Sequence, residues 1–287
     1  MGTSTHVATQ QAADRISVRQ RCVDALAKAC VDVRPAIQLN SIGYHSDFRE
    51  ALVEGVSPSA FVDDLQAGAG QELQSKFLAP HSSSALAVNS FGWFAGKAGQ
   101  ICLGDHKHLS LVGFEQKFPT GLARAQPPNL DIVLEGEGTL VAIESKCLEY
   151  LSPKVPKFST RYRDEILDER RDGPWYKEML RILDDKDHGY RHLDVAQLIK
   201  HALGLSYKQR RNVVLVYLWW EPLNAGEFPI FSAHRDEISR LSRRVKGGDI
   251  AFHHMSYGEL WSQWRASGRE DLQAHVDRLH SRYSSDV

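Results

Sequence analysis

Two short apolar runs joined by a turn constrain this chain more than any other feature. The runs occupy residues 128–134 and 140–146, and the segment between them contains two glycines. Two such runs separated by a glycine-containing turn predict a β-hairpin. Because side chains alternate faces along a strand, Glu144 and Lys146 are expected on one face of the second strand and Ser145 on the other.

Three charged side chains would converge on this hairpin. Asp131 lies on the first predicted strand, and Glu144 and Lys146 lie on the second. Carboxylates in an open oxygen-rich pocket suit Mg²⁺, which prefers one or two protein carboxylates with water and phosphate oxygens. An ammonium group beside them can hold the attacking water or help to deprotonate it, and it offsets charge that builds on the phosphate.

The Glu-x-Lys pattern is short, and it recurs at Glu115–Lys117. A charged pair on a strand also has a simpler interpretation, as a solvated face or a cross-strand ion pair. Glu144 ends an unbroken apolar run, where an unpaired charge is costly. This position therefore favours a functional role for Glu144 and Lys146.

The arrangement resembles the PD-(D/E)XK nuclease superfamily, which has the restriction-endonuclease-like fold. That core runs helix, three antiparallel strands, helix and strand, with Asp on the second strand and Glu-x-Lys on the third. The same order is predicted here by strands at 109–118, 130–134 and 140–146, a helix at 194–203 and a strand at 212–219. The resemblance covers about residues 68–220. Ser82–Asn89, together with Phe114-Glu115 and Glu144-Ser145-Lys146, suggests bacterial restriction-endonuclease-like proteins of unassigned role. Pro128 departs from the pattern, standing three residues before Asp131 instead of next to it.

The resemblance implies an α/β fold with a mixed central β-sheet flanked by helices and an N-terminal helical cap. We expect a tail and cap over residues 1–67 and a nuclease-like core over 68–287, with an insertion at 147–193. Within the cap, residues 1–13 are expected to form a loose tail before a helix at 15–31. Other expected elements are a helix opening at 68, a serine-capped helix after 82, helices at 233–245, 257–265 and 271–283, and an edge strand at 250–255.

Further candidates surround the three charged residues. Alternation along 109–118 puts Glu115 opposite the aromatic face, where it could be another acidic ligand beside Asp131. The resemblance implies a metal or water ligand at Glu72, for which the alternative is a first-turn glutamate that favours its own helix dipole. The backbone carbonyl of Ser145 is a further metal-ligand candidate.

The helix predicted at 194–203 is well specified, with Asp194 as its N-cap and Gly204 as its end. The resemblance implies that Gln197 reaches the metal-bound water or the substrate phosphate. The alternative is that Gln197, like His201, lies off the buried stripe on a solvated face.

The segment at 147–193 is long for a connection between a strand and its following helix. Its basic residues are interleaved with aromatic ones, a mixture that suits phosphate contacts and base stacking. The acidic residues that it also carries leave the alternative of an insertion packed on the core. The nucleic-acid-binding candidates are Lys154, Lys157, Arg161 and Arg163.

The composition limits the function. The net charge is −1, so phosphate contacts must come from local basic clusters. The four cysteines lack CxxC spacing, which indicates a reduced cytoplasmic setting, and the apolar stretches are too short to span a membrane. No glycine-rich phosphate-binding loop occurs, so no nucleotide cofactor is expected.

The sequence therefore predicts a Mg²⁺-dependent nuclease, with Mn²⁺ as a substitute, that acts as an endonuclease on duplex DNA. Restriction, defence and repair are roles of this type, and a homodimer is left open. The alternative is a catalytically inactive nucleic-acid-binding or scaffold protein that retains the nuclease fold.

Overall fold

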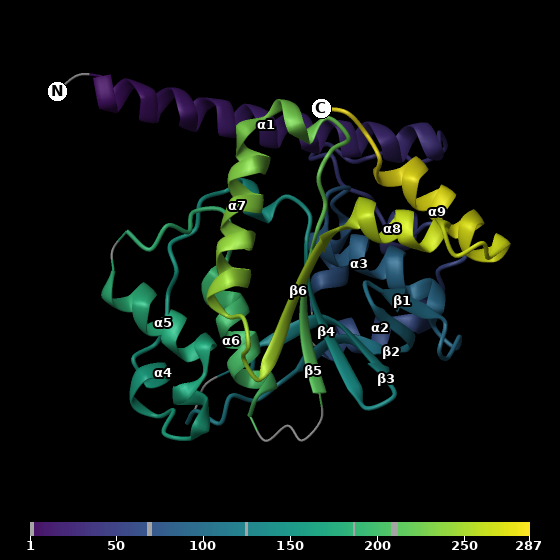
Figure 1. Cartoon of the computed structure of the whole chain (residues 1–287). Helices are drawn as coiled ribbons and strands as arrows, with labels where there is room; N and C mark the ends of the chain where they lie inside the picture. The colour runs from purple at the N-terminus through teal and green to yellow at the C-terminus, as the bar shows by residue number, and fades with distance from the viewer. Residues whose placement is uncertain (1–2, 68–70, 124–125, 186, 208–211) are drawn as a thin grey trace.

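The fold is a six-stranded mixed β-sheet flanked by helices, as the sequence predicts (Figure 1). The computed structural model describes residues 3–67, 71–123, 126–185, 187–207 and 212–287. The strands follow one another in sequence order across the sheet. They are β1 (Ile101–Leu103), β2 (His106–Lys117), β3 (Asn129–Gly136), β4 (Thr139–Lys146), β5 (Asn212–Trp219) and β6 (Ile250–Ser256).

The first four strands are antiparallel, and β5 and β6 then add to the sheet in parallel with β4. The hairpin is confirmed, with Ile132 paired to Ile143, so Asp131 stands opposite Glu144. β6 is an edge strand as expected, whereas β1 was not predicted because three residues carry too little periodicity.

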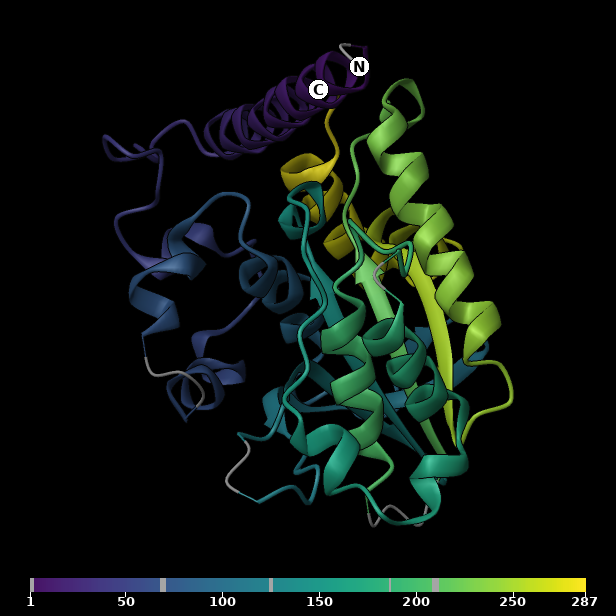
Figure 2. The ribbon, with the colours of Figure 1, turned by 90° about the vertical axis from the view of Figure 1, so that its left-hand side faces the viewer.

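Helices cover both faces of the sheet. They are α1 (Thr3–Val33), α2 (Val62–Ala67), α3 (Ser83–Phe91), α4 (Arg161–Asp164), α5 (Pro174–Asp184), α6 (Val195–Leu205), α7 (Pro229–Arg244), α8 (Tyr257–Arg265) and α9 (Glu270–Tyr283). Helices α6 and α7 pack on β5 and β6, and α3 packs on β3 and β4. Figure 2 shows α2 and α3 on one side of the strands and α7 on the other, while α1 lies across one end of the molecule.

Two expectations for the N-terminal region are wrong. The tail expected at 1–13 is part of α1 from Thr3 onward, because residues 3–13 contain no glycine or proline that would interrupt the helix continuing to Val33. The helix expected from residue 68 begins outside the described residues. Its continuation forms only two 3₁₀ turns, Glu72–Gln74 and Lys76–Leu78, separated at Ser75 by a non-helical backbone with φ −137° and ψ −94°.

Hydrogen bonds tie the N-terminal region to the last helix. Asn89 accepts from the backbone of Val53 at 2.8 Å and donates to the hydroxyl of Tyr283 at 2.7 Å. Arg282 donates to the carbonyls of Leu26 and Pro80 at 3.2 and 2.8 Å. The helices α1 and α9 therefore pack together at one end of the molecule (Figure 1).

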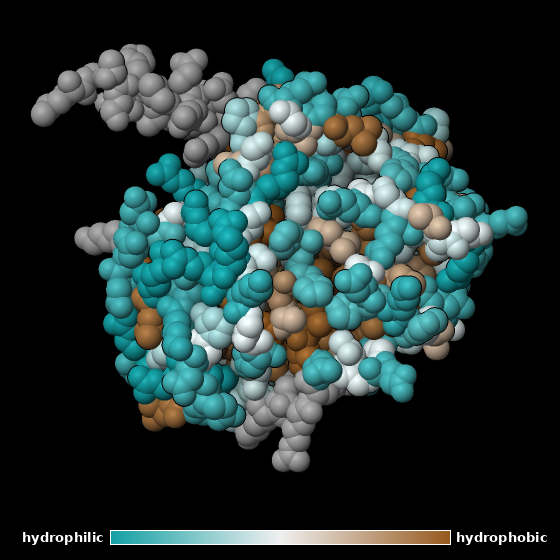
Figure 3. Space-filling model, in the orientation of Figure 1, coloured by the Kyte–Doolittle hydropathy of each residue, from teal (hydrophilic) through white to brown (hydrophobic). Residues whose placement is uncertain are grey.

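The sheet curls so that its two edges approach each other. Gln263 and Trp264 of α8 donate to the carbonyls of Gly104 and Cys102 beside β1, at 2.6 and 2.7 Å. The same helix also packs on β6 at the other edge. Figure 3 shows apolar residues over the centre of this face, between the hydrophilic surfaces of the flanking helices.

The helix α6 confirms one expected boundary and corrects the other. Asp194 caps it by accepting from the backbone N–H of Gln197 at 3.1 Å. The helix continues past Gly204 to Leu205. Glycine is needed at 204 because a Cβ there would lie 2.6 Å from the carbonyl oxygen of Phe118.

Among the described residues, the longer helices are too polar, and the apolar ones too short, to cross a membrane.

The contact at Gly204 predicts a stability effect. Gly204→Ala should lower the free energy of unfolding by about 1–3 kcal/mol, because the added methyl group meets backbone that cannot move aside cheaply. Urea unfolding followed by circular dichroism measures this change. Gly226→Ala is the control, since a Cβ there has no neighbour within 4 Å. Equal stability of the two variants would contradict the packing described here.

Candidate active site

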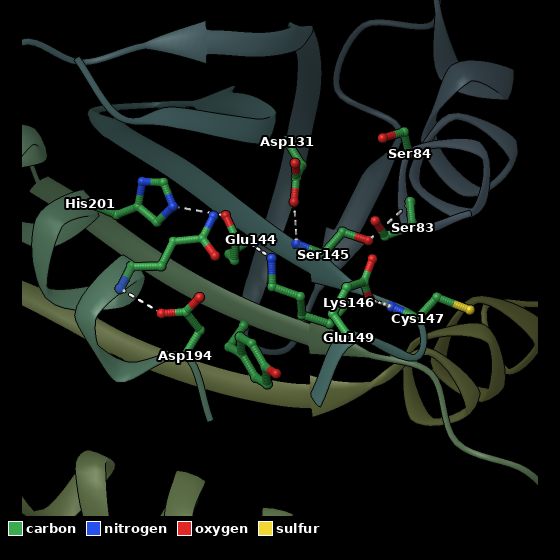
Figure 4. A network of polar contacts seen from close by, with 12 residues as sticks. Ser83, Ser84, Asp131, Glu144, Ser145, Lys146, Cys147, Glu149, Asp194 and His201 are labelled. Carbon is green, nitrogen blue, oxygen red and sulfur yellow. Dashed lines mark hydrogen bonds and ion pairs between the residues drawn. The ribbon is translucent and has the colours of Figure 1, made fainter. Parts of the chain in front are cut away.

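The hairpin brings Asp131, Glu144 and Lys146 together (Figure 4). Lys146 Nζ donates to Glu144 Oε1, so the two side chains share one face of β4 as predicted. Asp131 Oδ2 accepts from the backbone N–H of Ser145 at 2.6 Å, which holds the carboxylate against β4. All three predicted residues therefore lie at one place on neighbouring strands.

Ser145 points to the opposite face of the sheet, as the alternation predicts. Its hydroxyl lies 2.7 Å from the hydroxyl of Tyr257 in α8 and 3.4 Å from the carbonyl oxygen of Ser83, which begins α3. These contacts occupy the side chain on the far face. Any metal contact from Ser145 would thus come from its backbone carbonyl.

The charged pair on β4 is buried. Glu144 is 1% exposed and Lys146 is 9% exposed. Burial opposes the ionisation of Glu144, but Lys146 and then His201 outweigh it and lower the pKa of Glu144 to about 2. Burial likewise opposes the charge on Lys146, whereas Glu144 and Asp131 raise its pKa above the usual value. Both groups are therefore charged near neutral pH.

His201 is a site residue that the sequence analysis missed. Its Nε2 lies 2.8 Å from Glu144 Oε2, and both side chains are 1% exposed. Figure 4 shows Glu144 between His201 and Lys146. The expectation of a solvated face at His201 is wrong because α6 is buried on most sides. The sequence contained one signal for this role, because His201 lies one helical turn after Gln197, which was already a candidate for the site.

Glu115 joins the site through an unusual backbone conformation. Its φ of +49° is rare for a residue other than glycine and adds to the register shift between Leu111 and Gly113. The pairing of β2 with β3 places Glu115 opposite Asp131, and Asn129 Nδ2 donates to its Oε2 at 3.2 Å. Strict alternation would place Val112 on the same face as the buried Phe114, but the register shift leaves Val112 53% exposed.

The second Glu-x-Lys differs from the first in its contacts. Lys117 Nζ donates to the backbone carbonyl of Ala67, at 3.2 Å, on the exposed end of β2. Lys146 instead donates to Glu144 in the protein interior. The buried ammonium–carboxylate pair therefore lies at 144–146.

Carboxylates outnumber cations at this site. Burial and then the charge of Glu144 raise the pKa of Asp131 well above its usual value. Burial and then the charge of Glu72 raise the pKa of Glu115 to about 7. Glu72 accepts from the hydroxyl of Ser84 at 2.5 Å. Repulsion thus links these acidic side chains, since Glu144 and Glu115 act on Asp131, and Glu72 acts on Glu115.

This donor set fits a hard cation. Within the described ranges, no group of three or more His, Cys, Asp or Glu side chains could hold a metal ion by itself. Mg²⁺ does not need such an enclosure, because it keeps several waters and binds one or two carboxylates. Asn129 Oδ1 is a further buried oxygen, with no hydrogen-bond partner in the described part of the chain. The residues Asp131, Glu144, Glu115 and Glu72 thus offer oxygen donors only.

The remaining residues predicted from the sequence lie partly near the candidate site and partly in or before α4. Gln197 lies in the first turn of α6, next to its cap Asp194. Lys154 pairs with Asp194 at 2.9 Å and borders the same crevice as Lys146. Arg161 and Arg163 lie in α4, where they pair with Glu165 and Asp184 at 3.7 and 2.6 Å, and Lys157 lies in the segment before α4.

The mixed sheet, with its Asp on one hairpin strand and its Glu-x-Lys on the next, defines a restriction-endonuclease-like protein. Residues 31–284 match the family REase-ARP, described as Restriction Endonuclease associating with ARP, and the chain belongs to this family. The match includes every strand of the sheet and all the site residues named above. No curated protein and no solved structure matches the chain.

The raised pKa of Glu115 predicts pH-dependent stability. Its pKa rises from 4.5 to about 7 on folding, so its contribution to stability is present below pH 4.5 and is lost as pH rises through about 7. Glu115→Gln stays neutral and should be more stable than the wild type at pH 8 by up to about 3 kcal/mol. The two proteins should be nearly equal at pH 4.5. Urea unfolding in EDTA measures the difference.

The control for this measurement is Glu137→Gln, which changes an exposed glutamate in the turn between β3 and β4. Its stability relative to the wild type should stay constant between the two pH values. A pH-independent effect of Glu115→Gln would show that this carboxyl does not meet the repulsion described above.

Proposed function

We propose that this protein is a Mg²⁺-dependent nuclease that hydrolyses phosphodiester bonds in DNA as an endonuclease. The observation that carries the proposal is the buried Glu144–Lys146 pair opposite Asp131, within a chain of a restriction endonuclease family. Replacing a buried ion pair with apolar residues often leaves the stability of a protein unchanged or raises it. Stability alone is therefore a weak reason for a protein to contain such a pair. Catalysis supplies the stronger reason.

Asp131, Glu144 and the carbonyl of Ser145 would hold the metal ion, with Glu115 and Glu72 as supporting ligands through water. Mg²⁺, when bound, polarises the phosphate and lowers the pKa of a bound water. The positive charge of a bound metal ion would also offset the repulsion among the carboxylates that raises the pKa values of Asp131 and Glu115. Mn²⁺ has similar ligand preferences and would substitute.

Lys146 would act through its ammonium group. Because its pKa is raised, it donates hydrogen bonds to the attacking water and to the phosphate and does not serve as the base. His201 would orient Glu144 by its contact with Oε2 at 2.8 Å. Gln197, one turn earlier in α6, would hold the water or a phosphate oxygen.

Duplex DNA is the proposed substrate, in keeping with the family. Lys154 lines the same crevice as Lys146, and it would contact the backbone close to the cut. Lys157, Arg161 and Arg163 would extend that contact along the strand. The family description adds association with ARP, and we propose that this chain acts beside such a partner in the cytoplasm.

The triad predicts which substitutions abolish cleavage. Asp131→Asn, Glu144→Gln and Lys146→Met should each lower plasmid cleavage by about a hundredfold or more, because the first two weaken metal binding and the third removes the charge that acts on the water and the phosphate. The double variant Glu144→Gln/Lys146→Met removes both buried charges and should stay folded. Lys117→Met, in the other Glu-x-Lys, should cleave like the wild type. The reverse pattern would assign the site to residues 115–117.

The oxygen donors predict the choice of metal. Mg²⁺ and Mn²⁺ should support cleavage, whereas Ca²⁺ should support DNA binding with little turnover, because its looser geometry holds water and phosphate less well. Plasmid nicking with each ion after EDTA treatment measures this order. Cleavage that survives EDTA would show that hydrolysis occurs without this site.

A further inference from the structure

A cavity of about 340 Å³ lies beside the candidate active site. Its walls come from three parts of the chain that are distant in sequence, namely α1, residues 44–83 and residues 148–154. It shares Glu149 and Lys154 with the small crevice that contains Lys146 and Tyr217. Glu72, in the cavity wall, is also one of the four acidic side chains of the candidate site.

Cations and aromatic rings line this cavity. Arg19 enters from α1, and Lys76 and Lys154 enter from the two other walls. Two carboxylates oppose them, but Glu72 already accepts from Ser84 and Glu149 accepts from the backbone of Cys147 at 2.7 Å. Arg19 and Lys76 form no ion pair with any described residue, so their charges remain available to an anionic ligand.

The rings of Tyr44 and His81 lie edge to face in the same cavity, with centroids 6.2 Å apart. His81 Nδ1 is buried and has no hydrogen-bond partner in the part of the chain that the structure describes. Burial and then Arg19 lower the pKa of His81, so its ring is neutral at pH 7 and can both donate and accept. A nucleobase offers a flat ring face and polar edge groups that match these two residues.

The size of the cavity limits its occupant. A volume of about 340 Å³ is near the lower end for small-ligand pockets. A duplex is too wide to enter a cavity of this volume. A single nucleotide is small enough for this volume. Its phosphate carries the negative charge that the cations of the cavity can bind, and its base supplies a ring for the aromatic residues.

Building on the proposed nuclease function, we infer that this cavity binds one unpaired nucleotide of the substrate strand next to the scissile phosphate. Arg19 and Lys76 contact its phosphate, and Tyr44 and His81 contact its base. The unpaired nucleotide comes either from a single-stranded tail or from a base extruded out of a duplex. The substrate is therefore DNA with a locally unpaired strand.

Fluorescence anisotropy in EDTA tests this inference with the full chain. The probes are a blunt DNA hairpin, the same hairpin with a short single-stranded tail, and the same hairpin with one mismatch. The tailed hairpin, the mismatched hairpin or both should bind about tenfold more tightly than the blunt one, since stacking of one base supplies that much. Tight binding of the tailed probe alone assigns the cavity to strand ends, and tight binding of the mismatched probe assigns it to extruded bases. Equal affinity for all three overturns the inference.

Two variants locate the effect in the cavity. Arg19→Gln/Lys76→Gln should reduce the slope of log affinity against log salt by about 1.4 for the preferred probe. Tyr44→Leu should lower its affinity about tenfold and leave the blunt hairpin unaffected. The matched control Arg21→Gln/Lys28→Gln removes two exposed charges from α1 outside the cavity. Its salt slope should equal that of the wild type, and a loss equal to that of Arg19→Gln/Lys76→Gln overturns the inference.

A parallel cleavage assay with Mg²⁺ separates this inference from the proposed function. Cleavage without any preference for unpaired strands overturns the nucleotide site and leaves the nuclease intact. A preference for unpaired strands without cleavage under any metal supports the cavity and overturns the nuclease. Lys76 is exposed, so Lys76→Gln alone retains the fold and repeats the test if the double variant is unstable.

Discussion

The structure depends on one buried ion pair, between Glu144 and Lys146 in the fourth strand. Removing two such charges from water costs several kcal/mol for each ion. The cost is offset because each charge meets the other, and because His201 lies 2.8 Å from the second oxygen of Glu144. This arrangement requires α6 to dock at a set position on the sheet. It also requires β3 and β5 to enclose the strand from both sides.

The alternation of β4 connects the two layers of the protein. Glu144 and Lys146 face α6, while Ser145 between them faces α3 and α8 through Ser83 and Tyr257. A shift of one residue in register would turn Glu144 and Lys146 toward α3 and α8 and Ser145 toward α6. Neither buried charge would then meet its partner. The geometry of the candidate site and the strand register are therefore specified by the same three residues.

Sequence reasoning located the strands well, since β3, β4 and β5 are apolar runs bounded by turns or caps. It also identified the three residues on the hairpin, because the two-residue period of a strand makes their convergence predictable. It could not find His201, whose role depends on how α6 docks, nor the positive φ of Glu115, which follows from the β2–β3 irregularity. Glu72 was chosen only from the order of the elements along the chain. Sequence reasoning expected a longer helix there and missed that the 3₁₀ turn ends at Ser75, where the backbone is not helical.

The bonds from Arg282 to the carbonyls of Leu26 and Pro80 have a consequence for synthesis of the protein. Helix α1 leaves the ribosome long before Arg282, which holds it against the body of the protein and lies 256 residues after Leu26. The hairpin likewise emerges long before Tyr257, which anchors the far side of β4. A partly translated chain thus carries Asp131, Glu144 and Lys146 without the framework that aligns them. The proposed active site would therefore be complete only after Tyr257 has been made.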